Sequence, residues 1–298
     1  MKGKPNLFVI GAAKSGTTTI FDILNQHPDI FCPTTKEPKY FSSDLQGFDG
    51  PGDLAEQLNI CFSKSEYENI FKTSQKYKYY ADCSPDNLYY AETTAQRIYK
   101  YSPDARIIVV LRDPIERSFS QFTHMRRDLR ENHTNIIDAS NAFESQRKFK
   151  NYEFMWDYIG ASNYEKNLNY FLKLFHSNVL IIDFKNLMGN QHDTAYEIFS
   201  FLGLKKVNIQ EVHSNKSGFP PSNPSIIYRL LKLNGHIRKI IRDVLISLKI
   251  HNFAKRISQK IQFLELEKKQ LQSHEKDYLW TYLKKEVEFY NSLFNEKN

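Results

Sequence analysis

The sequence has few cysteines, no long apolar run and no internal repeat. Its three cysteines, Cys32, Cys61 and Cys83, cannot all pair with one another, and their spacing fits no metal site. No stretch approaches the roughly 20 consecutive apolar residues of a membrane-spanning helix. Met1–Pro5 leads directly into an apolar stretch that predicts a strand, which leaves no room for a signal peptide. We therefore expect a soluble, cytoplasmic protein whose thiols are reduced and structural.

Composition bounds the size of the core and the charge of the ligand. The 298 residues are 41% hydrophobic, which is enough for one large α/β domain, alone or with appendages. The formal net charge of +7 favours polyanionic ligands. This charge does not distinguish a nucleotide from nucleic acid, an acidic glycan or an anionic membrane.

The chain is organised around a glycine-bearing turn near its start. Leu7–Ile10 predicts a buried strand, Gly11 and Gly16 permit a sharp turn, and an amphipathic helix follows. Backbone N–H groups at such a helix start carry the positive end of the helix dipole and bind anions. The hydroxyl groups of Thr17–Thr19 add further donors. This stretch therefore predicts an anion-binding loop.

The spacing of Gly11 and Gly16 is that of a nucleotide-triphosphate P-loop, but the P-loop has a lysine directly after its second glycine. Thr17 occupies that position here, and the lysine comes earlier, at Lys14. The loop keeps a cradle for an anion and lacks the Lys-Ser/Thr pair that anchors magnesium. A sulfuryl group needs no metal to neutralise it and fits such a loop. A nucleotide kinase and an unrelated tight turn are the alternatives.

A second candidate anion site follows the apolar run Ala105–Leu111. This run predicts a strand buried on both faces of a parallel sheet, and ligands bind at the carboxyl ends of such strands. Arg112 comes directly after the run, and Asp113 and Pro114 have the N-cap and first positions of a helix. Ser120 lies about two turns into that helix. We expect Arg112 and Ser120 to bind one phosphate together.

These motifs resemble those of the sulfotransferases that use 3′-phosphoadenosine 5′-phosphosulfate (PAPS). Lys14–Thr18 is similar to the 5′-phosphosulfate loop of that family, and Leu111–Ser120 is similar to its 3′-phosphate motif. Lys36–Phe41 resembles the glutamate-bearing segment of the carbohydrate sulfotransferases related to the heparan sulfate enzymes. The resemblance covers most of residues 6–224. It implies a three-layer, P-loop-like α/β fold with a central parallel sheet flanked by helices.

The resemblance also implies roles for single residues. Lys14 and Glu37 would be catalytic, with Glu37 as the general base. His27 is the rival base and ranks second, because a His-Pro pair after a helix is usually a turn element. The structural alternative for Glu37 is a surface ion pair with Lys36 or Lys39. The residues implied to bind the donor are Lys14, Ser15, Gly16, Thr17, Thr18, Thr19, Arg112, Ser120, Lys216 and Gly218. No metal is implied.

Three local features have both a functional and a structural interpretation. Burial against Tyr40 and Phe41 would strengthen Glu37 as a base, whereas its neighbouring lysines would weaken it. Ser84 either contacts the substrates or only begins a turn. The charge-dense segment His124–Arg130 is typical of a solvated helix face, with binding of an acidic acceptor as the alternative.

The acceptor and the carboxyl-terminal part are less well defined. Loops 42–56 and 126–158 would select the acceptor. Residues 1–298 would form one sulfotransferase domain, in which 225–298 is a helical, basic extension. Residues 226–261 could lie on an anionic membrane or glycan, but a packed helix pair with a solvated face is favoured.

We predict sulfuryl transfer from PAPS to a hydroxyl or amine of a carbohydrate-like acceptor by in-line displacement, with no metal and no nucleic-acid partner. Two alternatives belong to other classes. One is a metal-dependent P-loop kinase. The other is a nucleotide- or polyanion-binding protein without turnover.

Overall fold

The computed structural model describes residues 3–57, 60–212 and 269–294. Its centre is a five-stranded sheet with the strand order β2-β3-β1-β4-β5, in which each strand runs parallel to its neighbours. The predicted α/β class with a central parallel sheet is therefore confirmed. The strands are β1 (Leu7–Gly11), β2 (Ile30–Phe31), β3 (Tyr79–Asp82), β4 (Arg106–Leu111) and β5 (Val179–Asp183).

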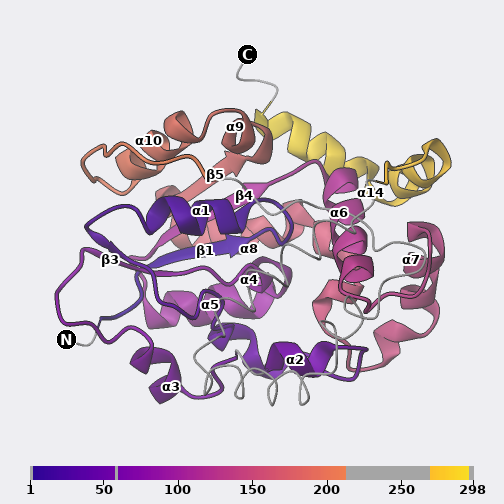
Figure 1. The fold of residues 1–298 in the computed structure, drawn as a ribbon, viewed down its shortest axis with the longest axis horizontal. Helices are drawn as coiled ribbons and strands as arrows, with labels where there is room; N and C mark the ends of the chain where they lie inside the picture. The colour runs from indigo at the N-terminus through magenta and orange to yellow at the C-terminus, as the bar shows by residue number, and fades with distance from the viewer. Residues whose placement is uncertain (1–2, 58–59, 213–268, 295–298) are drawn as a thin grey trace, which may run out of the picture.

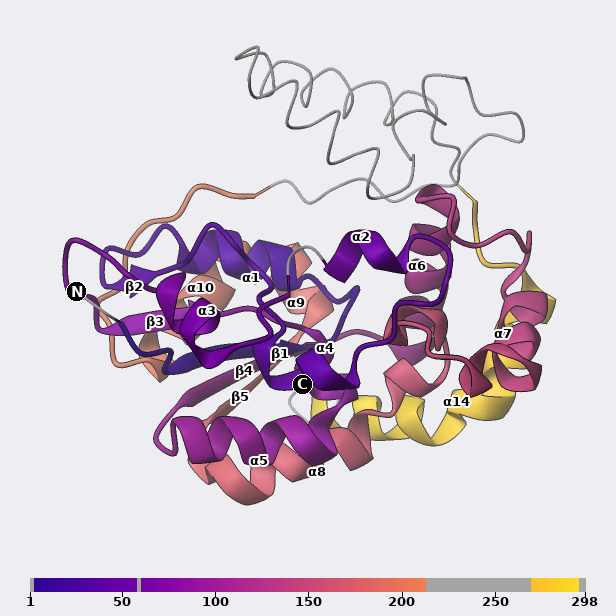
Figure 2. The same cartoon turned by 90° about the horizontal axis from the view of Figure 1, so that it is seen from below.

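Helices cover both faces of the sheet (Figure 1). Figure 2 shows the three layers most clearly, with α1 and α10 on one side of the strands and α5 and α8 on the other. The α-helices are α1 (Thr17–Leu24), α2 (Asp53–Gln57), α3 (Lys64–Asn69), α4 (Asp86–Tyr89), α5 (Ala91–Tyr101), α6 (Pro114–Arg127), α7 (Ile136–Ser145), α8 (Tyr164–Phe175), α9 (Phe184–Gly189), α10 (Gln191–Phe201) and α14 (Ser273–Phe294). Short 3-10 helices span Tyr40–Leu45, Arg147–Phe149, Phe154–Trp156, Gly160–Ser162 and His176–Asn178.

Alternate residues of the central strand β1 face opposite layers, as the pleat of a strand requires. Leu7 and Val9 belong to the apolar core shared with α1 and α10, whereas Phe8 and Ile10 belong to the core shared with α5 and α8. All four side chains are fully buried. Burying each of them contributes roughly 1.5–3 kcal/mol. The apolar run at the start of the chain therefore holds both helical layers on the sheet.

A third apolar cluster lies beside the sheet, where α6, α7 and α14 meet. Phe122 and Met125 of α6 belong to it together with Leu279 and Leu283 of α14. This packing fixes the direction in which α6 leaves the carboxyl end of β4. The single-domain organisation stays a prediction, and most of the basic extension lies outside the described residues.

Candidate active site

The turn between β1 and α1 presents backbone N–H groups at the start of α1. Gly16 is the N-cap at φ +92, a conformation that other residues rarely adopt, and a Cβ there would lie 2.9 Å from Leu187 Cδ2. Ile20 N donates to Gly16 O at 3.1 Å, so the N–H groups of Thr17–Thr19 have no acceptor within the helix. These groups form the positive end of the α1 dipole.

A cavity of about 440 Å³ opens at the carboxyl ends of β1 and β4. The glycine turn and the start of α1 form one wall, and residues along α6 form another. Arg112 and the glycine turn border the same cavity, which allows one ligand to contact both. The residues that line the cavity are Ala13, Lys14, Gly16, Thr17, Thr18, Thr19, Glu37, Lys39, Pro85, Arg112, Ser120, Thr123, His124, Arg127, Arg130, Glu153, Phe154, Met155, Phe184 and Met188.

Lys14 places an ammonium group in the wall of this cavity. Burial, followed by the charge of Arg127, lowers the pKa of Lys14 to about 8. The backbone of Lys14 has φ +67, a strained conformation of the kind that clusters at functional sites. An anion bound between Lys14 and Arg127 would offset both the burial of the ammonium and the repulsion between the two cations.

The threonines of α1 differ in their partners. Thr19 Oγ1 is buried at the cavity and lacks a hydrogen-bond partner within the described part of the chain. A buried polar atom without a partner costs about 1–3 kcal/mol, which an anion in the cavity would remove. Thr18 Oγ1 accepts a hydrogen bond from Lys36 Nζ at 2.8 Å. Ser15 is buried and does not line the cavity, and its N–H closes the turn by donating to Ala12 O at 3.1 Å.

Arg112, just before α6, and Ser120, within that helix, line the cavity. The guanidinium carbon of Arg112 lies 4.7 Å from the ring centroid of Phe184, and its Nε donates to Glu116 Oε2 at 3.3 Å. Asp113 caps α6 by accepting two backbone N–H groups at 3.0 Å, which confirms the predicted N-cap. The arginine is thus held against the cavity by a stacked ring and an ion pair, as a phosphate ligand needs to be.

Glu37 lines the cavity and also forms the predicted ion pair. Its Oε1 accepts from Lys36 Nζ at 3.1 Å, and 34% of its side chain remains exposed. Burial of Glu37 against Tyr40 and Phe41, which the sequence left open, is not found. Phe41 packs into the core instead, and Tyr40 stacks on Tyr67 with the ring centroids 4.6 Å apart.

His27 and Ser84 are turn elements and do not line the cavity. His27 is 2% exposed, its Nε2 lies 3.0 Å from Lys205 O, and its Nδ1 accepts the N–H of Asp29 at 3.1 Å. Ser84 is fully buried and donates to Asp82 Oδ1 at 2.6 Å. The structural interpretation therefore holds for both residues. Lys216 and Gly218 fall outside the described residues, so their roles stay predictions.

Residues 5–208 match the model of the sulfotransferase family. The chain belongs to this family. A sulfotransferase from Alicyclobacillus acidocaldarius has a similar crystal structure, with a TM-score of 0.66 and 31% identity over 70% of this chain and 84% of that chain. The predicted family and the predicted three-layer, P-loop-like fold are both confirmed.

Curated relatives carry names that specify carbohydrate acceptors. Human heparan sulfate glucosamine 3-O-sulfotransferase 6 is 21% identical over 72% of this chain and 58% of its own length. Mouse heparan sulfate glucosamine 3-O-sulfotransferase 3B1 is 25% identical over 74% of this chain and 52% of its own length. Human carbohydrate sulfotransferase 15 is 25% identical over 74% of this chain and 47% of its own length. The chain spans about half the length of the curated relatives it matches.

Several cavity residues of this family member were not predicted as site residues. His124, Arg127 and Arg130 face the cavity instead of a solvated surface. The sequence does hold a signal for two of them, because Ser120, His124 and Arg127 follow one another at helical spacing and so share one face of α6. Glu153 belongs to a distant segment whose sequence gives no such signal.

His124 is held as a neutral hydrogen-bond donor. Its Nδ1 lies 2.6 Å from an Nη atom of Arg127, which can only donate, so Nε2 carries the proton. Burial, followed by the charge of Lys14, places the pKa of His124 well below its usual value. A histidine in this state is a poor proton acceptor at neutral pH.

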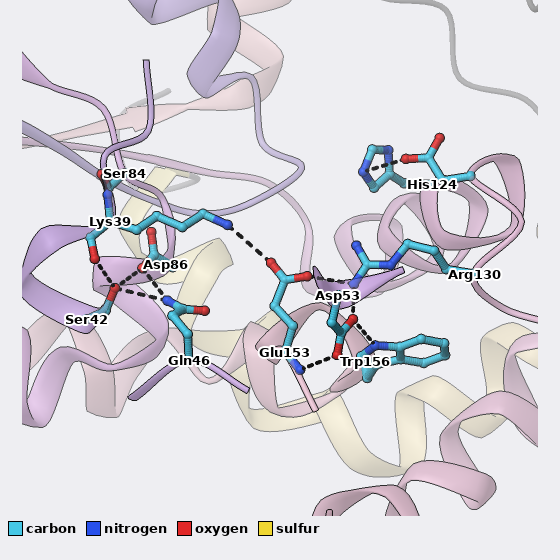
Figure 3. Close-up of polar contacts among 11 residues, drawn as sticks. Lys39, Ser42, Gln46, Asp53, Ser84, Asp86, His124, Arg130, Glu153 and Trp156 are labelled. Atoms are coloured by element: carbon cyan, nitrogen blue, oxygen red, sulfur yellow. Dashed lines mark hydrogen bonds and ion pairs between the residues drawn. The ribbon is translucent and has the colours of Figure 1, made fainter. Parts of the chain in front are cut away.

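A buried charge network joins the two predicted acceptor loops (Figure 3). Glu153 accepts from Lys39 Nζ at 3.2 Å and from Arg130 at 2.7 Å, and Arg130 also pairs with Asp53. Asp53 Oδ1 further accepts from Trp156 Nε1 at 2.9 Å. Burial favours the neutral acid of Glu153, but the charges of Lys39 and Arg130 outweigh it and lower its pKa. The network ties loop 42–56 to loop 126–158 at the edge of the cavity.

Glu153→Ala is expected to lower the free energy of unfolding by about 3–5 kcal/mol, because it leaves two buried cations without their shared partner. Urea denaturation monitored by tryptophan fluorescence measures the change. Glu144→Ala is the matched control, since Glu144 pairs with Lys148 at the surface and should contribute less than about 1 kcal/mol. Equal losses in the two variants would show that the buried network does not stabilise the fold.

Proposed function

We propose that this chain transfers a sulfuryl group from PAPS to a hydroxyl or amine of a carbohydrate-like acceptor. One observation carries the proposal: a single cavity is bordered by an uncapped helix start with Lys14 and by Arg112 and Ser120, which follow the neighbouring strand β4. PAPS carries anionic groups at both its 5′ and 3′ positions, so it matches two anion sites that share one cavity.

The residues of the first wall fit the 5′ end of the donor. The N–H groups of Thr17–Thr19 and the unpartnered hydroxyl of Thr19 would hold its oxygens. Lys14 would stabilise the negative charge that develops on the leaving 5′-phosphate oxygen. Arg112 and Ser120 would hold the 3′-phosphate, which distinguishes this donor from ATP.

Glu37 is the base that the cavity supports best. Two carboxylates and one imidazole line the cavity within the described ranges. Glu153 is committed to two cations, and His124 is a neutral donor with its Nδ1 occupied. Glu37 would accept the proton of the attacking hydroxyl or amine as sulfur bonds to the acceptor and its bond to the 5′-phosphate oxygen breaks.

The acceptor class rests on the relatives and on the polar end of the cavity. The named relatives act on heparan sulfate glucosamine and on carbohydrate. Lys39, Arg130 and Glu153 give the cavity a polar, charged lining with which sugar hydroxyls can bond. Nucleic acid has no place in the proposal. Membrane contact through residues 226–261 lies outside the described residues.

Location and metal use stay predictions. No helix in the described ranges is long and apolar enough to cross a bilayer. A cytoplasmic location remains the proposal drawn from the sequence. Transfer without a metal is proposed because Thr17 occupies the position of the P-loop lysine.

The alternatives have less support. A P-loop kinase predicts magnesium-dependent turnover of ATP, and its Lys-Ser/Thr pair is missing after Gly16. A binding protein without turnover would be indicated by a cavity remote from any candidate base. Glu37 borders this cavity.

Arg112→Ala is expected to weaken binding of 3′-phosphoadenosine 5′-phosphate (PAP) about 10- to 100-fold, because it removes a charge-assisted contact to the 3′-phosphate. Affinity for ADP, which lacks that phosphate, should change little. Isothermal titration calorimetry with PAP, ADP and AMP measures the preference in both proteins. A wild-type protein that binds ADP as tightly as PAP would contradict the proposed donor.

A further inference from the structure

Lys36 makes two contacts that no assigned role explains. Its Nζ donates to Thr18 Oγ1 at 2.8 Å and to Glu37 Oε1 at 3.1 Å. Thr18 belongs to the first turn of α1, on the donor wall of the cavity, whereas Glu37 belongs to the segment that follows β2. One ammonium group therefore bridges the start of α1 and the segment that carries Glu37.

The backbone around Lys36 is anchored close to the bridge. Pro33 and Pro38 flank the segment and fix φ at both positions. Pro38 O accepts the N–H of Cys61 at 2.9 Å, and the N–H of Lys39 donates to Ser84 Oγ at 3.0 Å. The segment is thus held in place directly after Glu37, and the side chain of Lys36 links it to the start of α1.

The charge around the bridge comes from several elements. Lys36 is the cation that hydrogen-bonds Glu37, and Asp22 of α1 lies near enough for Lys36 to oppose the rise in its pKa that burial causes. The side chains of Lys36 and Glu37 are 22% and 34% exposed, so solvent screens the pair and its effect on stability is small. The other titratable groups that act on one or both residues are Lys14, Cys83 and Asp86.

We propose that Lys36 is a positioning residue. It holds the base Glu37 at a fixed place relative to Thr18 in the first turn of α1, where the donor would bind. The inference rests on the proposed function and adds a residue to it. The ammonium of Lys36 donates both hydrogen bonds, so it fixes the distance between the Glu37 carboxylate and the start of α1. Misplacement of a reacting group by about 1 Å can lower a rate about 10²-fold, which makes this distance important.

The inference is tested by comparing Lys36→Met with Lys36→Arg, which keeps the charge, and with the matched control Lys64→Met. Lys64 forms an exposed ion pair with Glu68 at 3.7 Å, so its loss removes the same charge away from the cavity. We expect Lys36→Met to lower kcat about 10- to 100-fold with PAP affinity changed less than about threefold. Lys36→Arg should recover much of the rate, and Lys64→Met should match the wild type. A thermal melt of each variant shows that it is folded.

A second readout does not depend on activity. Crystal structures of the wild type and of Lys36→Met show the position of the Glu37 carboxylate directly, and we expect the carboxylate to move away from Thr18 when the bridge is lost. If Lys36→Met weakens PAP binding while kcat and the position of Glu37 stay as in the wild type, Lys36 is a donor ligand and the inference is overturned. An inactive wild-type protein in which Lys36→Met still displaces Glu37 would overturn the proposed function and leave the link between Lys36 and Glu37 standing.

Discussion

Replacing Lys14 with methionine is expected to lower kcat for sulfuryl transfer about 10²- to 10³-fold, the usual cost of losing one group that stabilises a developing oxyanion. Lys14 is the cation of the glycine turn, and it borders the cavity beside the uncapped start of α1. Methionine keeps the length and much of the volume of the side chain, so the loss reports the charge. Single-turnover assays with radiolabelled PAPS measure the rate of transfer directly.

Lys14 should also make the affinity for the donor depend on pH. Because the pKa of Lys14 is about 8 in the free protein, the ammonium loses its proton as the pH rises through that value. PAP affinity should therefore be highest below pH 8 and fall above it, with proton uptake on binding in the alkaline range. Lys14→Arg stays charged and should bind PAP with little change between pH 7 and about pH 10. The pKa of His124 lies far below this range, so it does not contribute.

Calorimetry in buffers of different ionisation enthalpy separates the outcomes. Uptake of a proton by the wild type near pH 8.5, absent in Lys14→Met, would support the assignment. PAP binding with the same pH dependence in both proteins would show that Lys14 does not contact the donor.

The parts of the fold that could be predicted are those that depend on a few consecutive residues. The runs Leu7–Ile10 and Ala105–Leu111 predicted buried strands, and both lie in the centre of the sheet. Asp113 and Pro114 predicted the start of α6, and the side chain of Asp113 caps it as expected. The short helix α9 was not predicted, because six residues are too few to show a helical period. Its first residue, Phe184, nevertheless supplies the ring beside Arg112.

The donor side of the cavity was predictable for the same reason, since the glycine turn and the Arg112 motif each lie within a few consecutive residues. The acceptor side was not. Lys39 and Glu153 are 114 residues apart in sequence, and Arg130 and Asp53 are 77 apart. Such pairs form through tertiary packing, and a single sequence carries no sign of which charges will meet. The partner of Tyr40 could not be predicted either, because its ring stacks on Tyr67, which belongs to another element.

Glu37→Gln is expected to lower kcat about 10²- to 10⁴-fold, the usual contribution of a general base. Glutamine preserves the shape of the side chain and still accepts a hydrogen bond from Lys36, so the contact between residues 36 and 37 should be kept. PAP affinity should therefore stay within about threefold of the wild type, since none of the proposed donor contacts involves Glu37. Stopped-time assays with PAPS and a panel of amino sugars and oligosaccharides measure the loss.

Chemical rescue separates a base from a structural carboxylate. Glu37→Ala opens space at a side chain that is already 34% exposed, so formate can enter and accept the proton. Added formate should restore part of the rate in Glu37→Ala, and it should restore none in Lys14→Met, where the missing group is a cation. Loss of activity without rescue, together with weaker PAP binding, would mean that Glu37 acts only through its ion pair with Lys36. Transfer at the wild-type rate in Glu37→Gln would require another proton acceptor. Glu153 and His124, the other candidate bases that the described residues place at the cavity, are both committed to other partners.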